Sequence, residues 1–115
     1  MTIGVKGIQP NFSNQNLNIS LPIFTIHGNH DYPSNDFGKI SVCDLLNASN
    51  YVNYFGKHLN LTDQGQKKIV IKPVIFQKNQ LKTRLAIYGL GYIKDLKLHK
   101  MFQDKCVIFE EPEKK

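Results

Sequence analysis

Two adjacent polar residues, Asn29 and His30, come directly after a short apolar stretch that ends in glycine. The neutral amide oxygen of an asparagine is a ligand that cations of the manganese or magnesium type accept readily. A histidine titrates near neutral pH, so it can give a proton to a departing alkoxide or hydrogen-bond to a phosphoryl oxygen. Together the two side chains suit two-metal hydrolysis of a phosphate ester. The residue types leave an alternative open, which is an ordinary polar turn with a structural or merely exposed histidine.

The elements around this pair indicate where it lies. Residues 21–27 favour a strand that is followed by Gly28, whose missing side chain allows a tight turn. In open α/β sheets, ligands and catalytic groups collect at the carboxyl ends of strands. His27 is expected to make a hydrogen bond at the strand end. Asp31 and Asp36 are expected to orient the neighbouring histidine or to cap the following helix.

Apolar periodicity predicts the other elements. Helices are expected at 39–49 and 95–102, and strands at 51–55, 69–78, 83–90 and 106–109. Pro73 should make the middle of its strand an edge, a bulge or a break, and the next strand should return as the second arm of a hairpin. Residues 57–68 are predicted to be a loop. Gly89 and Gly91 lack the third glycine of a phosphate-binding loop, so a tight bend is expected there. Short strands mixed with two helices predict an α/β fold.

The predicted helix at 39–49 has more than one apolar edge. Ile40, Cys43 and Leu46 form a stripe at helical spacing. Leu45 lies roughly 100° from Leu46 around the helix. This pattern fits either a broad core face or a second apolar edge that meets a partner. Residues whose side chains can cap a helix precede it, namely Ser34, Asn35 and Asp36.

Length and composition limit the class of protein. The chain has 115 residues, enough for one domain, and its formal net charge of +6 comes almost entirely from lysine. Attraction to a polyanion is possible, but Arg84 is the only arginine, so the arginine forks that read guanine are missing. No membrane span and no secretory signal is expected, because long apolar runs are absent. Cys43 and Cys106 are expected to be reduced, buried thiols of an intracellular protein.

Several stretches together resemble a known family. They are 17–33, which contains Gly-Asn-His-Asp, together with 44–46, 51–57, 88–95 and 101–109. Gly-Asn-His-Asp alone is typical of the calcineurin-like metallophosphoesterases. The flanking stretches are similar to the meiotic recombination 11 family of double-strand-break repair nucleases, which is related to bacterial SbcD. The resemblance covers nearly the whole chain after about Pro10.

The resemblance implies a fold and a set of roles. The fold would be part of a metallophosphoesterase sandwich of mixed β-sheets flanked by helices, truncated at both ends. Asn29 would bind one of two manganese ions, and His30 would stabilise the transition state and protonate the leaving oxygen. His27 and Asp31 would lie behind these two residues and help to hold them in position. Leu45 would face the second subunit of a homodimer.

The chain also departs from the family pattern. Tyr32 replaces a second acidic residue, and Leu96-Lys97 replace Glu-Arg. Asp-x-His, a bridging Gly-Asp and Gly-His-x-His, all of which the family needs, do not occur in the sequence. We therefore expect an internal segment of a larger domain, with residues 1–20 as an extended arm or loop, 21–109 as the partial nuclease domain and 110–115 as a charged tail.

For the whole protein, the resemblance implies a manganese-dependent nuclease of the nucleus that cleaves DNA as an exonuclease and a single-strand endonuclease. DNA, a second copy of the chain and an ATPase subunit would be its partners. The segment alone is expected to bind manganese weakly and to have no nuclease activity. The alternatives are another calcineurin-like phosphoesterase, such as a protein phosphatase, and a non-enzymatic interaction module.

Overall fold

A computed structural model of the chain describes residues 3–33, 40–58, 61–63, 66–78 and 82–112. The fold is mixed α/β, as the sequence predicted. The elements in chain order are β1 (Ile3–Lys6), the single-turn 3-10 helix η1 (Asn11–Ser13), β2 (Phe24–Thr25), α1 (Val42–Ala48), β3 (Asn53–Tyr54), β4 (Leu61–Asp63), β5 (Gln66–Ile71), β6 (Pro73–Lys78), β7 (Arg84–Tyr88), α2 (Asp95–Gln103) and β8 (Val107–Phe109).

One sheet is antiparallel and has the order β1-β6-β7. The hairpin of β6 and β7 confirms the prediction, with Val74 opposite Ile87. Pro73 is the first residue of β6. At this position the missing N–H of proline does not interrupt the hydrogen bonds between neighbouring strands. Residues 3–6 were expected to lie in an arm or loop, and this was wrong, because they pair with β6 as β1. The pairing partner is about 70 residues away along the chain, so local sequence carried no signal for it.

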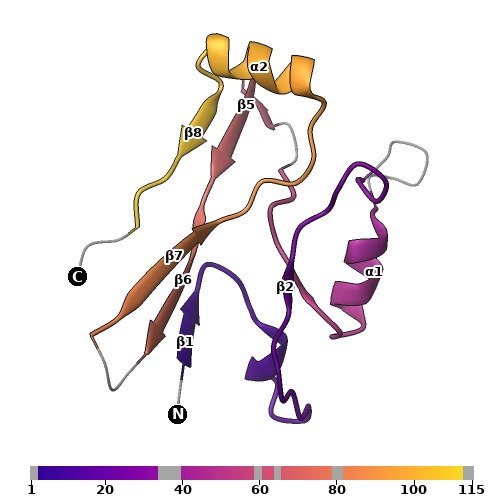
Figure 1. The fold of residues 1–115 in the computed structure, drawn as a ribbon, viewed down its shortest axis with the longest axis vertical. Coiled ribbons are helices and arrows are strands. Elements are labelled where there is room, and N and C mark those ends of the chain that lie inside the picture. The colour runs from indigo at the N-terminus through magenta and orange to yellow at the C-terminus, as the bar shows by residue number, and fades with distance from the viewer. Residues whose placement is uncertain (1–2, 34–39, 59–60, 64–65, 79–81, 113–115) are drawn as a thin grey trace.

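A second sheet has the order β4-β5-β8 and contains the core. Ile69 and Ile71 of β5 are fully buried together with Met101 of α2. Figure 1 shows α2 lying across the ends of β5 and β8, where it covers these side chains. The loop predicted at 57–68 was wrong in part, because residues 61–63 and 66–68 form an antiparallel pair. Apart from Leu61 these residues are polar, and they lack apolar alternation, which is why the pattern did not indicate a strand.

Strands β2 and β3 pair in parallel, and helix α1 connects them. Phe24 lies opposite Asn53, and Thr25 lies opposite Tyr54. The strands predicted at 21–27 and 51–55 are thus present but reduced to two residues each. Parallel pairing places the carboxyl ends of both strands at one edge, and this is the edge from which the Asn29–His30 turn leaves.

Helix α1 begins later than predicted. Ser41 is its N-cap and forms a capping box with Asp44, so the helix does not include residues 40 and 41, and residue 39 lies outside the described residues. The three capping residues proposed from the sequence, Ser34, Asn35 and Asp36, lie outside the described residues. Of the predicted apolar stripe, only Cys43 is buried, whereas Ile40 and Leu46 are exposed. The prediction that α1 presents a broad core face was therefore wrong for this chain.

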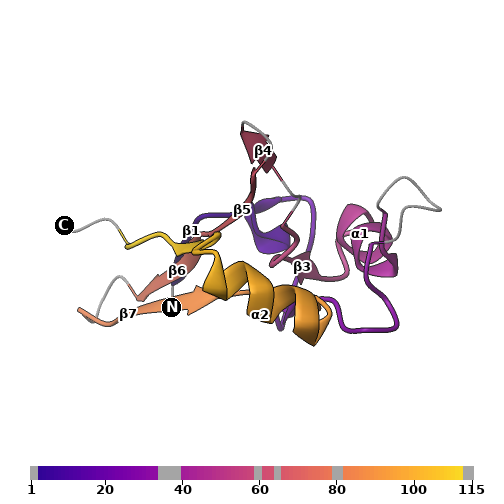
Figure 2. The same ribbon diagram turned by 90° about the horizontal axis from the view of Figure 1, so that it is seen from above.

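Helix α2 confirms the helix predicted at 95–102, and β8 confirms the strand predicted at 106–109. Figure 2 shows α1 and the β6–β7 hairpin at opposite sides of the molecule. Both cysteines are free, as expected, but Cys106 is only partly buried. Among the described residues, no helix is long and apolar enough to cross a membrane.

Candidate functional site

Asn29 and His30 lie in an exposed turn just beyond β2. Among the described residues, neither side chain has a hydrogen-bond partner or an ion pair. Both side chains are therefore available to solvent and to a ligand. Most polar side chains nearby, in contrast, form hydrogen bonds with one another. The turn also lies at the edge of the sheet where α/β folds present functional groups.

His27, two residues before this pair, is fixed and only 7% exposed. Its Nε2 lies 3.4 Å from the carbonyl oxygen of Tyr92, and its Nδ1 lies 2.6 Å from the hydroxyl of Tyr54. A carbonyl oxygen can only accept, so Nε2 donates to it, and in the neutral ring Nδ1 accepts from the tyrosine hydroxyl. The hydrogen bond predicted for His27 at the strand end is confirmed.

Burial lowers the pKa of His27, because removing the ring from water disfavours its charged form. Burial likewise raises the pKa of Tyr54. Both shifts keep the pair neutral at physiological pH. The ring of His27 is thus a structural group that joins the end of β2 to β3 and to the segment after β7, and the exposed histidine that follows it is the chemically available one.

Two glycines allow this close packing. A Cβ placed on Gly91 would lie 1.9 Å from Cε1 of His27, and one on Gly89 would lie 2.5 Å from the ring of Phe55. Backbone hydrogen bonds complete the contact, since Gly91 N–H donates to the carbonyl of Gly56 at 2.9 Å. The sequence predicted a tight bend here. The structure shows instead that both glycines are needed so that the backbone can approach two rings.

The side chain of Asp31 forms hydrogen bonds to the first residue of the turn and to helix α1. Its Oδ1 accepts from Gly28 N–H at 2.5 Å, and its Oδ2 accepts from the Cys43 thiol at 3.4 Å. The hydroxyl of Ser41 donates to the Asp31 backbone carbonyl. The bond from Gly28 is the main reason that the pKa of Asp31 is lowered. Asp31 thus contacts the turn backbone and the helix, and the structure gives it no hydrogen bond to the His30 ring.

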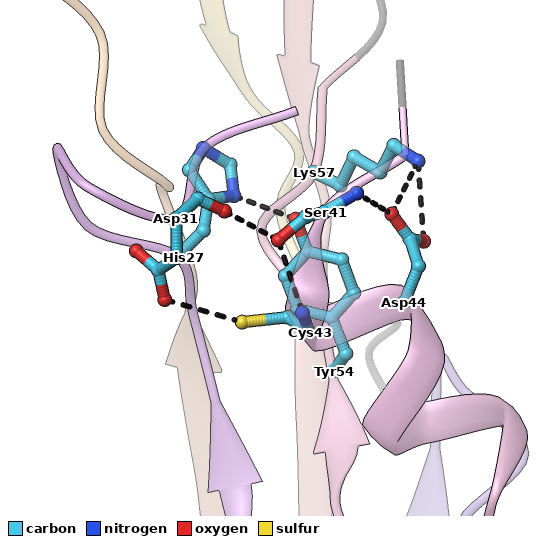
Figure 3. A network of polar contacts seen from close by, with 7 residues as sticks. All are labelled: His27, Asp31, Ser41, Cys43, Asp44, Tyr54 and Lys57. Carbon is cyan, nitrogen blue, oxygen red and sulfur yellow. Dashed lines mark hydrogen bonds and ion pairs between the residues drawn. The ribbon is translucent and has the colours of Figure 1, made fainter. Parts of the chain in front are cut away.

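A connected set of polar groups continues along the first turn of α1 (Figure 3). The N–H of Ser41 donates to Asp44 at 2.7 Å, and Lys57 contacts both carboxylate oxygens of Asp44 at 2.9 and 3.1 Å. Burial raises the pKa of the Cys43 thiol, so that group stays protonated and can donate to Asp31. Sequence reasoning missed Ser41, although the Ser-x-x-Asp spacing of the capping box was a usable signal.

The other two histidines differ in burial. His58 is half-buried, and its Nε2 lies 2.9 Å from the carbonyl oxygen of Gly89. His99 is exposed on α2.

Among the described residues, the donors do not by themselves fit a two-ion metal site. In the described part of the chain, no three His, Cys, Asp or Glu side chains come together as a metal-binding group. Asn29 offers one amide oxygen, and one ligand does not hold two cations. Manganese binding through Asn29 would therefore need further ligands from other parts of a larger domain.

The fold and the turn define a class, that of an α/β unit consistent with part of a metallophosphoesterase domain. No family model matches the chain. It is, however, similar to three curated proteins that are each named double-strand break repair protein MRE11. The rice protein is 46% identical over 95 residues, which cover 83% of this chain and 13% of the relative. The Encephalitozoon cuniculi protein is 44% identical over 103 residues, which cover 90% and 17%. The human protein is 42% identical over 104 residues, which cover 89% and 13%.

The chain therefore belongs to the MRE11 family of double-strand break repair proteins, as a segment that matches a small part of its relatives. The family resemblance inferred from the sequence is thus confirmed. The relatives are much longer than the matched segment, so the roles of Asn29 and His30, the metal, the dimer and the other partners are taken up below as proposals.

Proposed function

We propose that this chain is a segment of a manganese-dependent nuclease for double-strand break repair, and that Asn29 and His30 are its metal-binding and catalytic residues. The observation that carries the proposal is their placement. A possible metal ligand and a possible proton donor lie side by side on an exposed turn, and neither has a partner among the described residues. The buried His27 holds the chain in place just before this turn. The relatives are named double-strand break repair proteins, and this supports DNA as the substrate.

The proposed roles follow from the chemistry of the two side chains. Manganese, when bound, would supply charge stabilisation for a phosphodiester under attack. Asn29 would provide one neutral oxygen ligand, and His30 would hold a proton for the departing oxygen. His30 is exposed, so it can reach a substrate that lies over the turn. The missing ligands would come from the remainder of the domain.

The proposal extends to location and partners. The surplus of lysine, with a formal net charge of +6, suits a phosphate backbone as a ligand, because lysine contacts phosphates without reading the bases. Leu45 is 62% exposed on α1 and would contact the second subunit of a homodimer. The proposal also includes an ATPase subunit as a partner and a location in the nucleus. Both rest on the family alone.

The first test uses the chain alone. Manganese titration by calorimetry is expected to show weak binding at most, and single-stranded DNA incubated with the chain and manganese is expected to stay intact. The physical reason is the incomplete ligand set. Clear turnover of DNA that is lost in Asn29→Ala would contradict the expectation that the segment is inactive by itself.

The second test places the segment in a complete domain. The matched segment of the Encephalitozoon cuniculi relative, which is 44% identical, is replaced by this chain, and manganese-dependent digestion of single-stranded DNA is measured. His30→Ala should lower the rate by about 10²-fold or more, the usual contribution of a general acid. His99→Ala on exposed α2 is the matched control. A folded chimera in which both variants have equal activity would overturn the role of His30, and activity on phosphopeptides but not on DNA would favour a protein phosphatase.

A specific observation also favours a second function, that of an interaction module. Val42, Leu45 and Leu46 are exposed side by side on α1, a larger apolar face than a single surface residue would give. If the module alone matters, Leu45→Asp should change the oligomeric state in analytical ultracentrifugation, whereas Asn29→Ala in the chimera should leave DNA digestion unchanged. Loss of digestion in Asn29→Ala would decide for the nuclease.

A further inference from the structure

The turn that carries Asn29 and His30 is attached to helix α1 through its last residue, Asp31, and the backbone attachment is made by Ser41. Ser41 is 3% exposed, and its hydroxyl donates to the backbone carbonyl of Asp31, the residue that follows His30. The same hydroxyl oxygen accepts from the N–H of Cys43 at 3.0 Å. A hydroxyl has one proton to give, so Ser41 uses its donor on the turn and an acceptor position on the helix.

The two side chains of interest have no partners of their own among the described residues. Their directions are therefore set by the backbone of residues 28–31. That backbone is held at its start by Asp31, whose Oδ1 accepts from Gly28 N–H at 2.5 Å. It is held at its end by the Ser41 hydroxyl and, through Oδ2 of Asp31, by the Cys43 thiol at 3.4 Å. Both attachments at the end come from the first turn of α1 (Figure 3).

We propose that Ser41 is a positioning residue for the site, which fixes the turn that presents Asn29 and His30 by tying the Asp31 carbonyl to the N-terminus of α1. The proposal deepens the proposed function, because it gives the turn a defined geometry toward a substrate, but the contact itself does not depend on nuclease activity. Without the Ser41 donor, the hydrogen bond from the Cys43 thiol to Asp31 is the one that would remain between the turn and α1 among the described residues.

Three substitutions separate this role from simple helix capping. Ser41→Gly removes the donor to Asp31 but preserves most of the cap, because glycine is itself among the residues preferred at a helix N-cap. Ser41→Thr keeps both the donor and the acceptor. Ser49→Ala makes a comparable change at the exposed C-terminal end of the same helix and serves as the control.

The test is ¹⁵N relaxation on the 115-residue chain and its variants, with circular dichroism to follow helix content. In Ser41→Gly, the backbone order parameters of residues 28–31 should fall from about 0.85 to below about 0.6, while those of 42–48 remain high. Ser41→Thr and Ser49→Ala should match the parent chain. Side-chain relaxation of Asn29 and the His30 ring should follow the backbone.

Three results would overturn the proposal. Order parameters of 28–31 that are unchanged in Ser41→Gly would show that the contact positions nothing, and low values in the parent chain would show that the turn is not fixed at all. Equal loss of order in α1 and the turn would assign Ser41 to capping only and would also reject the proposal. Because none of these readings involves DNA or metal, failure here is distinct from failure of the proposed nuclease.

Discussion

The exposed turn and the base beneath it differ sharply although they adjoin in the sequence. The base consists of His27 with the groups that pack on it, and it is buried, glycine-lined and joined by hydrogen bonds to two distant segments. The turn presents Asn29 and His30 to solvent. The difference teaches that neighbouring residues of one motif can lie in opposite environments. His27 is buried and hydrogen-bonded, whereas His30, three residues later, is exposed.

The largest effect on stability is expected at the base. In Gly91→Ala, the new Cβ would lie 1.9 Å from the His27 ring, so the backbone or the ring must move. We expect the free energy of unfolding to fall by about 3 kcal/mol, the upper part of the range for overpacking. Gly28→Ala in the turn is the control, because its nearest neighbour, Asp31 Oδ1, is 3.3 Å away, and a loss of about 1 kcal/mol or less is expected. Urea denaturation followed by circular dichroism measures both. Equal losses would remove the distinction between base and turn.

A buried amide beside the base should come next. Asn53 is 2% exposed, accepts from Asn11 N–H at 2.6 Å and donates to the Ile23 carbonyl at 3.2 Å. Asn53→Ala would leave the Asn11 N–H buried without this acceptor, and such a group costs about 1–3 kcal/mol. Exposed Asn18→Ala should change the unfolding free energy by less than about 0.5 kcal/mol. An Asn53→Ala variant as stable as the parent in urea denaturation would contradict this assignment.

The pH dependence of stability should locate His27 in the base. Its pKa is lowered by burial, so below the ordinary value of about 6.5 the unfolded chain binds more protons than the folded one. The contribution is complete above that pH and is lost as the pH falls toward the lowered pKa of the folded state. Unfolding free energies between pH 7 and pH 5 should therefore decrease, and His27→Gln should reduce that slope while exposed His99→Gln should not. An unchanged slope in His27→Gln would place the titrating group elsewhere.

The smallest effect on stability is expected in the turn itself. Asn29 and His30 have no partners among the described residues, so Asn29→Ala and His30→Ala should each shift the unfolding free energy by no more than about 0.5 kcal/mol. Together with the loss of DNA digestion expected in the chimera, such small changes in stability would indicate that the two side chains serve the reaction and not the fold. A loss above about 1 kcal/mol in urea denaturation for either variant would mean that the turn also serves the fold.

Local patterns predicted the elements that local contacts build. The hairpin of β6 and β7 and helix α2 followed from strand alternation, Pro73 and helical spacing. Strand β1 and the pair formed by residues 61–63 and 66–68 were missed, because their partner strands, and not their own residue patterns, complete their hydrogen bonds. The α1 core face was predicted wrongly, since only Cys43 of that stripe is covered. The start of α1 was placed too early, although Ser41 and Asp44 carry the spacing of a capping box.

The candidate site divides in the same way. By itself, the sequence determined that Asn29 and His30 stand together after a strand and a glycine, and it carried the resemblance to the MRE11 family, which the relatives confirm. Only the tertiary structure decided that Gly91 is needed against His27, that His58 bonds to Gly89, and that Ser41 reaches Asp31. The physical reason is distance along the chain. Each of these contacts joins residues that lie ten or more positions apart, and only the folded backbone brings them within bonding range.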